Sequence, residues 1–155
     1  MEKRTFILSA PAFLIAPSLP ATADSVFHAT KDSRVTLLYL GQVSCPACRG
    51  YEAEYFGRMN RMATSFPEFR EIDYLKLSMG SGKATVSAWQ LPDHLKWIAT
   101  ETRGGESPIK NNYGTPFFVG VVDREVWAQG PAVSGLEGDV IPALRRAVLE
   151  RSGRI

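Results

Sequence analysis

The sequence predicts an α/β fold in which a central mixed β-sheet is flanked by helices. Two apolar runs, at 35–40 and 117–122, have the composition of strands that are buried on both faces. Other segments repeat apolar residues at spacings of three and four, which predicts amphipathic helices. With 155 residues, of which 45% are apolar and 22% charged, the chain is expected to form one soluble globular domain.

The charge balance argues against a nucleic-acid-binding protein. The chain has 18 Lys and Arg against 16 Asp and Glu, a formal net charge of +2. Such a small and dispersed charge does not form the basic face that binds phosphate backbones. We therefore expect no nucleic-acid partner.

The first 23 residues have the pattern of an export signal. Two basic residues precede an apolar run at 6–16, and Ala-Thr-Ala at 21–23 is a small-x-small cleavage site. The run is much shorter than the roughly 20 apolar residues of a membrane-spanning helix. We expect residues 1–23 to be a cleaved signal peptide, residues 24–155 to form the mature domain, and the protein to be periplasmic. The alternative is that residues 1–23 form an N-terminal arm, either disordered or packed on the core.

The two cysteines of the chain lie between the first predicted strand and the first predicted helix. β-branched and apolar residues at 35–40 predict the strand. From 51 to 66, apolar residues recur at helical spacing, which predicts a helix that ends near Pro67. Cys45 and Cys48 therefore lie at the start of this helix.

The position of the cysteine pair favours redox chemistry over structural stabilisation. A disulfide that encloses only Pro46 and Ala47 removes little entropy from the unfolded chain, so it adds little stability. Pro46 is tolerated at the first helical position, and the N–H groups of Ala47 and Cys48 can then point at the Cys45 sulfur. These donors and the helix dipole stabilise a thiolate, so we expect the pKa of Cys45 to lie below the free value of about 8.5. Cys45 is then the nucleophile and Cys48 the resolving thiol.

This arrangement resembles the thioredoxin superfamily, in which a buried strand is followed by Cys-x-x-Cys at the start of a helix. The resemblance implies a thioredoxin-like fold with Cys45 and Cys48 as catalytic residues. It also implies a cis-proline beside the sulfurs, just before a strand, and here Thr115-Pro116 leads into 117–122. A substrate peptide is expected to contact the residues around the sulfurs, which are Pro46, Ala47, Thr115 and Pro116. The alternative for Pro116 is an ordinary trans proline that opens an edge strand.

Two further strands are expected. Residues 71–79 predict a second strand parallel to the first. A turn at 123–124 connects 117–122 to an antiparallel strand at 125–128, and Gly-Pro at 130–131 ends it. Together these strands complete a mixed sheet.

Two further helices are expected. The segment 80–112 is longer than the corresponding link in a minimal thioredoxin, and 92–102 predicts a short inserted helix within it. Near the C-terminus, Asp139 is expected to cap a helix over 141–151, with Pro142 tolerated in its first turn.

Several positions depart from the pattern of the superfamily. Small thioredoxins have a buried acid on the strand before the motif, which takes a proton from the resolving cysteine, and this chain has Tyr39 there. Ser44 replaces the tryptophan that precedes the first cysteine, and the pair Pro46-Ala47 lacks the histidine of strongly oxidising relatives. The buried acid that accepts a proton in small thioredoxins is therefore missing. Because the histidine is also missing, we expect the helix terminus to be the main cause of a lowered Cys45 pKa.

Other side chains near the motif are expected to be structural. Arg49, Glu52 and Glu54 are expected to form a solvated helix face, with tuning of the cysteine pair by one of them as the alternative. The side chains of Trp89, Trp97 and Tyr113 are expected to pack segment 80–112 onto the domain, with contact to a protein substrate as the alternative.

Metal and haem sites are not expected. The only thiol and imidazole ligands lack the spacing of a zinc site, and they are Cys45, Cys48, His28 and His94. Haem attachment requires a histidine after the second cysteine, where this chain has Arg49.

The sequence therefore predicts an exported, monomeric thiol–disulfide oxidoreductase that exchanges disulfides with protein substrates. No cofactor is expected, since the electrons reside on Cys45 and Cys48. A reductant supplied by a membrane electron-donor protein is favoured, because Pro46-Ala47 does little to overstabilise a thiolate. The alternatives are a disulfide oxidase or isomerase, and a thioredoxin-like binding module in which the Cys45–Cys48 disulfide is inert.

Overall fold

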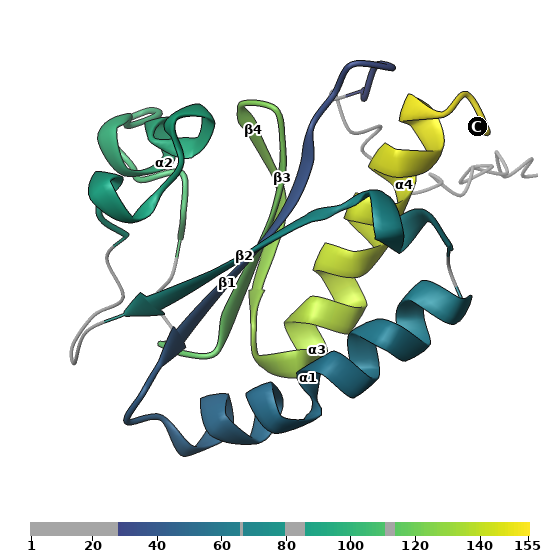
Figure 1. The fold of residues 1–155 in the computed structure, drawn as a ribbon. Coiled ribbons are helices and arrows are strands. Elements are labelled where there is room, and N and C mark those ends of the chain that lie inside the picture. The colour runs from purple at the N-terminus through teal and green to yellow at the C-terminus, as the bar shows by residue number, and fades with distance from the viewer. Residues whose placement is uncertain (1–27, 66, 80–85, 111–113) are drawn as a thin grey trace, which may run out of the picture.

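The computed structural model describes residues 28–65, 67–79, 86–110 and 114–155. Its four strands lie in the order β2-β1-β3-β4 (Figure 1). β1 (Val35–Gln42) is parallel to β2 (Asp73–Met79) and antiparallel to β3 (Phe117–Val122), which pairs antiparallel with β4 (Glu125–Pro131). The mixed sheet predicted from the sequence is confirmed, although β1 and β4 extend beyond their predicted ends.

β1 is an inner strand of the sheet and is buried on both faces. Val35, Leu37 and Tyr39 pack into the cluster on one face, whereas Leu38 and Leu40 pack into the cluster on the other. All five residues are at most 1% exposed. A continuous apolar run is what a strand covered on both sides requires.

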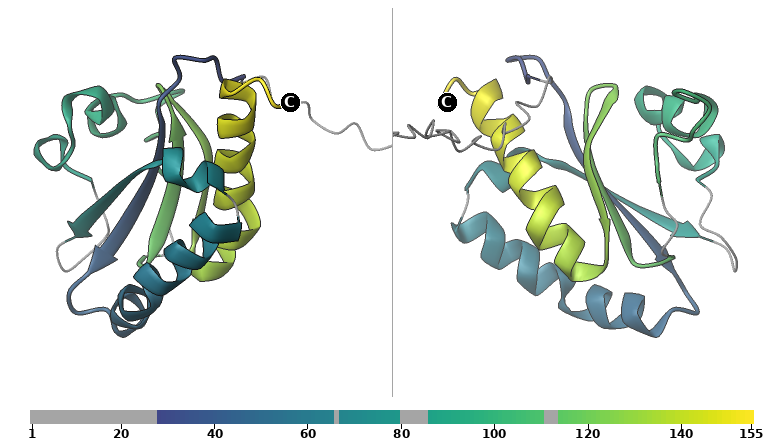
Figure 2. Two further views of the ribbon diagram at one scale, coloured as in Figure 1. Left: turned by 45° about the vertical axis from the view of Figure 1, so that its right-hand side comes forward. Right: turned by 180° about the vertical axis from the view of Figure 1, so that it is seen from behind.

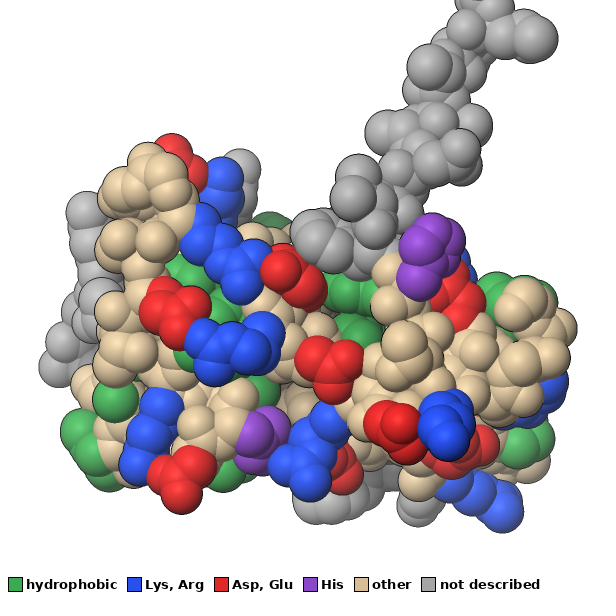
Figure 3. Space-filling model, turned by 90° about the horizontal axis from the view of Figure 1, so that it is seen from above, with side chains coloured by type: hydrophobic (Ala, Val, Ile, Leu, Met, Phe, Trp, Pro, Cys, Tyr) green, Lys and Arg blue, Asp and Glu red, His purple; other side chains and the backbone are tan. Residues whose placement is uncertain are grey.

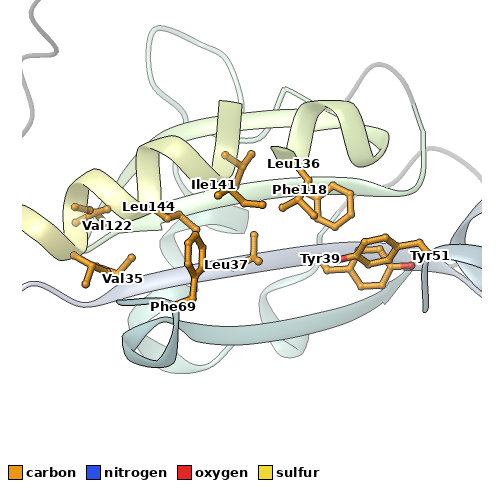
Figure 4. Packing of buried hydrophobic residues seen from close by; sticks show 13 residues of the cluster. Val35, Leu37, Tyr39, Tyr51, Phe69, Phe118, Val122, Leu136, Ile141 and Leu144 are labelled. Atoms are coloured by element: carbon orange, nitrogen blue, oxygen red, sulfur yellow. The ribbon is translucent and has the colours of Figure 1, made fainter. Parts of the chain in front are cut away.

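Two helices cover one face of the sheet (Figures 1 and 2). α1 (Pro46–Ser65) follows β1, and α4 (Ile141–Arg151) lies near the C-terminus. Between them and the sheet lies a cluster that includes Tyr51 from α1 and Leu144 from α4 (Figure 4). Burial of this apolar surface holds the start of α1 against the sheet.

The segment between β2 and β3 covers the opposite face. It contains two 3-10 turns, Ala88–Gln90 and Asp93–Leu95, and the one-turn helix α2 (Trp97–Thr100). The helix expected over 92–102 is therefore shorter and broken, because the chain becomes extended at Glu101. Leu95 and Ile98 of this segment nevertheless pack inward against the sheet.

The two tryptophans of this segment behave differently. Trp97 is 3% exposed and packs on the sheet, which confirms the expected structural role. Trp89 is 83% exposed, so the expectation that it packs the segment onto the domain is wrong. The 3-10 turn that carries Trp89 is held instead by Gln90, whose amide donates to the Ser78 carbonyl over 2.9 Å.

The C-terminal helical region begins earlier than the sequence suggested. α3 (Ala132–Gly135) and a π-helical turn at Leu136–Val140 lead directly into α4. Asp139 lies exposed within the π turn, so its expected role as an N-cap is wrong. Pro142 has no N–H and crowds the preceding turn, which the wider π turn accommodates.

A close contact between two glycines lies where this helical region begins. A Cβ atom on Gly130 would lie 2.9 Å from the Gly135 Cα atom, so the end of β4 and the end of α3 meet at their backbones. Because this contact joins residues on two elements, the helical pattern of the sequence does not reveal it.

Basic and acidic side chains are interspersed on the face seen from above (Figure 3). Ion pairs near the β3–β4 turn, such as Arg103 with Glu125 and Arg124 with Glu101, account for part of this pattern. Another pair joins the C-terminal helix to the 3-10 turn Pro67–Glu71, where Arg145 Nε lies 2.5 Å from Glu68 Oε1.

We predict that Arg145→Met destabilises the protein by roughly 1 to 2 kcal/mol at pH 7, between the values for exposed and buried ion pairs. Glu68 is only 4% exposed, and the bond from Arg145, helped by a backbone hydrogen bond, lowers its pKa. A lowered folded pKa contributes stability above the unfolded value of about 4.3 that is lost as the pH falls through the folded value. The difference between wild type and variant should therefore shrink below about pH 4.

Urea unfolding at pH 7 and pH 3 measures this effect. The control is Lys96→Met, which breaks the exposed pair with Asp93 and should leave stability nearly unchanged. Equal losses for Arg145→Met at both pH values would contradict the assignment.

Candidate active site

Cys45 and Cys48 form a disulfide at the N-terminus of α1, and their Cα atoms lie 5.2 Å apart. α1 begins at Pro46, as predicted. The backbone N–H of Cys48 donates a hydrogen bond to Cys45 Sγ over 3.1 Å, which is the geometry expected from the sequence. The Arg49 N–H bonds to the Cys45 carbonyl over 3.1 Å and closes the first turn. In the reduced protein, a donor aimed at Sγ at the positive end of the helix dipole favours a Cys45 thiolate.

The two sulfur-bearing residues differ in access. Cys48, in the first turn of α1, is 0% exposed, whereas Cys45, just before the helix, is partly exposed. Pro46 and Ala47 are exposed beside Cys45, and Val43 before the motif is 82% exposed. A large substrate approaching this end of the sheet therefore meets Cys45 and not Cys48.

The loop before β3 lies against the disulfide. The Thr115 carbonyl oxygen lies 3.4 Å from Cys45 Sγ. The Thr115–Pro116 peptide bond is cis, as expected from the resemblance, and the trans alternative is excluded. The structure thus brings together the two groups of residues that the sequence singled out, one from the motif and one from this loop.

The strand register explains why these groups meet. Leu40 of β1 is the partner of Phe117 of β3, and the strands are antiparallel. Gln42, two residues further along β1, therefore lies opposite Thr115. The Thr115 hydroxyl donates to Gln42 Oε1 over 3.3 Å, which links the end of β1 to the loop.

A charged network that sequence reasoning did not identify lies on the sheet-facing side of α1. The Tyr39 hydroxyl donates to Glu52 Oε1 over 3.1 Å, and Lys76 Nζ lies 2.6 Å from Glu52 Oε2. The expectation that Glu52 belongs to the solvated helix face is therefore wrong. The available signal was its spacing of four residues from Cys48, which places both on one side of the helix.

The network fixes the protonation of its members. The bond from Lys76 is the main cause that lowers the pKa of Glu52, and the Tyr39 bond acts in the same direction. Burial raises the pKa of Tyr39 well above its usual value, and the carboxylate of Glu52 adds to this. At neutral pH Glu52 is therefore anionic and Tyr39 is neutral.

Three further predictions concern features beyond the disulfide. Within the described ranges, His, Cys, Asp and Glu side chains form no group of three that could hold a metal ion. None of the helices that the structure describes is both long and apolar enough to cross a membrane. The expected signal peptide at 1–23 lies outside the described residues.

Comparison with known proteins gives no match: no family model fits the chain, and no curated protein or solved structure is detectably similar to it. The functional argument therefore depends on the residues and geometry of the site itself.

We predict that iodoacetamide modifies Cys45 at least about tenfold faster than Cys48 in the reduced protein at pH 7. The reason is twofold, because Cys48 is fully buried and its N–H points at the Cys45 sulfur. The Cys45 rate should rise with pH around a midpoint below about 8.5. Peptide mapping after timed alkylation measures both rates.

The control is the same reaction in denaturant, where the two rates should become similar. Equal rates in the folded protein, or a Cys45 midpoint at or above the free value, would contradict the proposed difference between the sulfurs.

Proposed function

We propose that the protein is a thiol–disulfide oxidoreductase with a thioredoxin-like fold, in which Cys45 reacts with protein substrates and Cys48 resolves the intermediate. The observation that carries this proposal is the hydrogen bond from the Cys48 N–H to Cys45 Sγ at the start of a 20-residue helix. A structural disulfide needs no such donor, whereas a reactive thiolate is stabilised by it.

The sheet supports the thioredoxin-like assignment. β1 and β2 are parallel, β3 and β4 form an antiparallel hairpin, and the cysteine motif follows β1 directly. The segment between β2 and the cis peptide then corresponds to an insertion relative to a minimal thioredoxin. It covers the face of the sheet opposite α1 and leaves Cys45 partly exposed.

The proposed reaction takes place in two exchanges. The Cys45 thiolate attacks one sulfur of a substrate disulfide, forms a mixed disulfide and releases the other substrate sulfur as a thiolate. Cys48 then loses its proton and attacks Cys45 Sγ, which releases the second substrate sulfur and forms the Cys45–Cys48 disulfide. Two electrons have moved from the protein to the substrate.

The loop before β3 suits a role in holding the substrate chain. The Thr115 carbonyl lies beside Cys45 Sγ, where an extended substrate peptide would pass on its way to the sulfur. Backbone groups of this loop, next to buried Pro116, would bond to the substrate backbone without selecting its side chains. Pro46 and Ala47 would flank the substrate on the other side.

The direction of electron flow is proposed to be reductive. Pro46-Ala47 supplies no imidazole to stabilise the reduced thiolate, which is the device that makes strong oxidants. A reductant in an oxidising compartment must be reduced again after each cycle. We propose that an electron-donor protein in the membrane does this, consistent with the export signal expected at 1–23.

We predict that a Cys48→Ser variant, incubated with oxidised glutathione, accumulates a stable mixed disulfide at Cys45, because the resolving thiol is absent. Wild-type protein should instead proceed to the Cys45–Cys48 disulfide, and Cys45→Ser should react much more slowly because Cys48 is buried. Intact-mass spectrometry with peptide mapping measures each species.

Two results would defeat the proposal. If the wild-type disulfide resists dithiothreitol and Cys48→Ser forms no adduct, the pair is inert and the domain is a binding module. If Cys45→Ser keeps full exchange activity, Cys45 is not the nucleophile.

A further inference from the structure

Three side chains from three elements meet on the side of α1 that faces the sheet. Tyr39 of β1 and Lys76 of β2 are direct partners in the strand register, so their side chains lie on the same face of the sheet. Both contact Glu52 of α1, at 3.1 Å from the Tyr39 hydroxyl and 2.6 Å from Lys76 Nζ. The carboxylate of Glu52 is thus held in one place by two donors.

This carboxylate lies one helical turn beyond Cys48. Residues four apart on a helix have Cβ atoms about 5 to 6 Å apart on the same side. Cys48 and Tyr39 are both 0% exposed, so the sulfur and the Tyr39 end of the network are buried, whereas the Glu52 and Lys76 side chains are 35% and 45% exposed. The Glu52 carboxylate therefore acts on the sulfur from the edge of the buried region, where charges interact more strongly than across bulk solvent.

The Tyr39 hydroxyl also extends toward the motif. A Cβ atom on Gly41 would lie 2.6 Å from this oxygen, so the Tyr39 ring runs along β1 toward the end that carries the cysteines. The ring is fixed by contacts with Tyr51 and Phe118, whose ring centroids lie 5.0 Å and 5.3 Å away (Figure 4). The acceptor and donors of the network are therefore rigidly placed.

Among the side chains that the structure describes, the other groups in this region provide no competing fixed charge. Arg49 and Glu54 of α1 are exposed. Phe118 of β3 packs its apolar ring against Tyr39 and Tyr51, and the neutral carbonyl of Thr115 lies beside Cys45 Sγ. Among the described side chains of α1, β1 and β2, the titratable groups of this region are Tyr39, Tyr51, Glu52 and Lys76, together with Tyr74 of β2, which also acts on Tyr39.

We propose that the Tyr39–Glu52–Lys76 network controls the ionisation of Cys48: the Glu52 carboxylate holds the buried sulfur in its thiol form, and Lys76 limits that effect. A thiolate at Cys48 would place a second negative charge beside Glu52, which is unfavourable. Cys45, at the positive end of the helix, has no such neighbour on its own turn. The two thiols therefore ionise in a fixed order, and Cys45 attacks first. This inference rests on the proposed function, since the order matters only if the pair exchanges.

The test removes each charge separately in a Cys45→Ser background, where Cys48 is the single thiol. Glu52→Gln leaves Lys76 uncompensated, so the midpoint of Cys48 ionisation should fall by about 0.5 to 1 pH unit. Lys76→Met leaves Glu52 uncompensated, so the midpoint should rise by a similar amount, about 0.5 to 1 pH unit. The double variant should return close to the parent value. Thiolate absorbance against pH, with Cys45→Ser/Cys48→Ala as the blank, measures the midpoint.

The matched control is Glu54→Gln, the same change of charge on the exposed part of the same helix. It should leave the midpoint nearly unchanged. Shifts in opposite directions cannot come from loosened packing, since both substitutions would loosen the same network. Shifts of equal sign, or no shift in variants with native near-ultraviolet circular dichroism, would overturn the proposal.

The titration is independent of the proposed function, because it needs no exchange. If wild-type protein fails to exchange with glutathione, the proposed function fails whatever the midpoints are. If exchange occurs and the midpoints do not move in opposite directions, only the role of the network fails. Tyr39→Phe provides a second variant: loss of one donor to Glu52 should shift the midpoint in the same direction as Lys76→Met, but less.

Discussion

The start of α1 at the end of β1 is the constraint on which the site depends. β1 is buried on both faces and paired on both edges, so it cannot slide without exposing its apolar residues. Its position fixes where the helix begins, and hence where Cys45 meets the N–H of Cys48. The same register brings Thr115 to the end of the strand. Sulfur, donor and loop are thus placed by the core and not by local contacts alone.

The chemistry of the site comes mainly from differences in environment between two identical side chains. Cys45 is accessible and lies at the positive end of a helix, whereas Cys48 is buried and one turn from an anionic Glu52. In the proposed reaction, these differences assign the roles of nucleophile and resolving thiol. The Thr115 carbonyl and the Cys48 N–H, which contact Cys45 Sγ, are backbone groups, and this would suit the proposed exchange with substrates of varied side chains.

The sequence was sufficient for the features that depend on local pattern. The buried strands, the helix that begins at Pro46 and the loop with Thr115-Pro116 were all predicted. The role of Glu52 was not, because helical spacing shows which side of a helix a residue occupies but not which strand residues it meets. That depends on the register of Tyr39 with Lys76. Asp139 was misassigned because the last helical region begins before it, at Ala132, where the close contact of Gly130 with Gly135 joins residues on two elements.

The equilibrium reduction potential of the Cys45–Cys48 pair tests the central claim most directly. It is measured by equilibrating the domain with glutathione redox buffers, quenching with an alkylating reagent and counting free thiols. A reversible couple nearer to about −270 mV than to −120 mV is predicted, as for a reductant of the thioredoxin type. A pair that stays fully oxidised at every glutathione ratio and does not exchange would contradict the redox role. A value near about −120 mV would contradict the reductive direction.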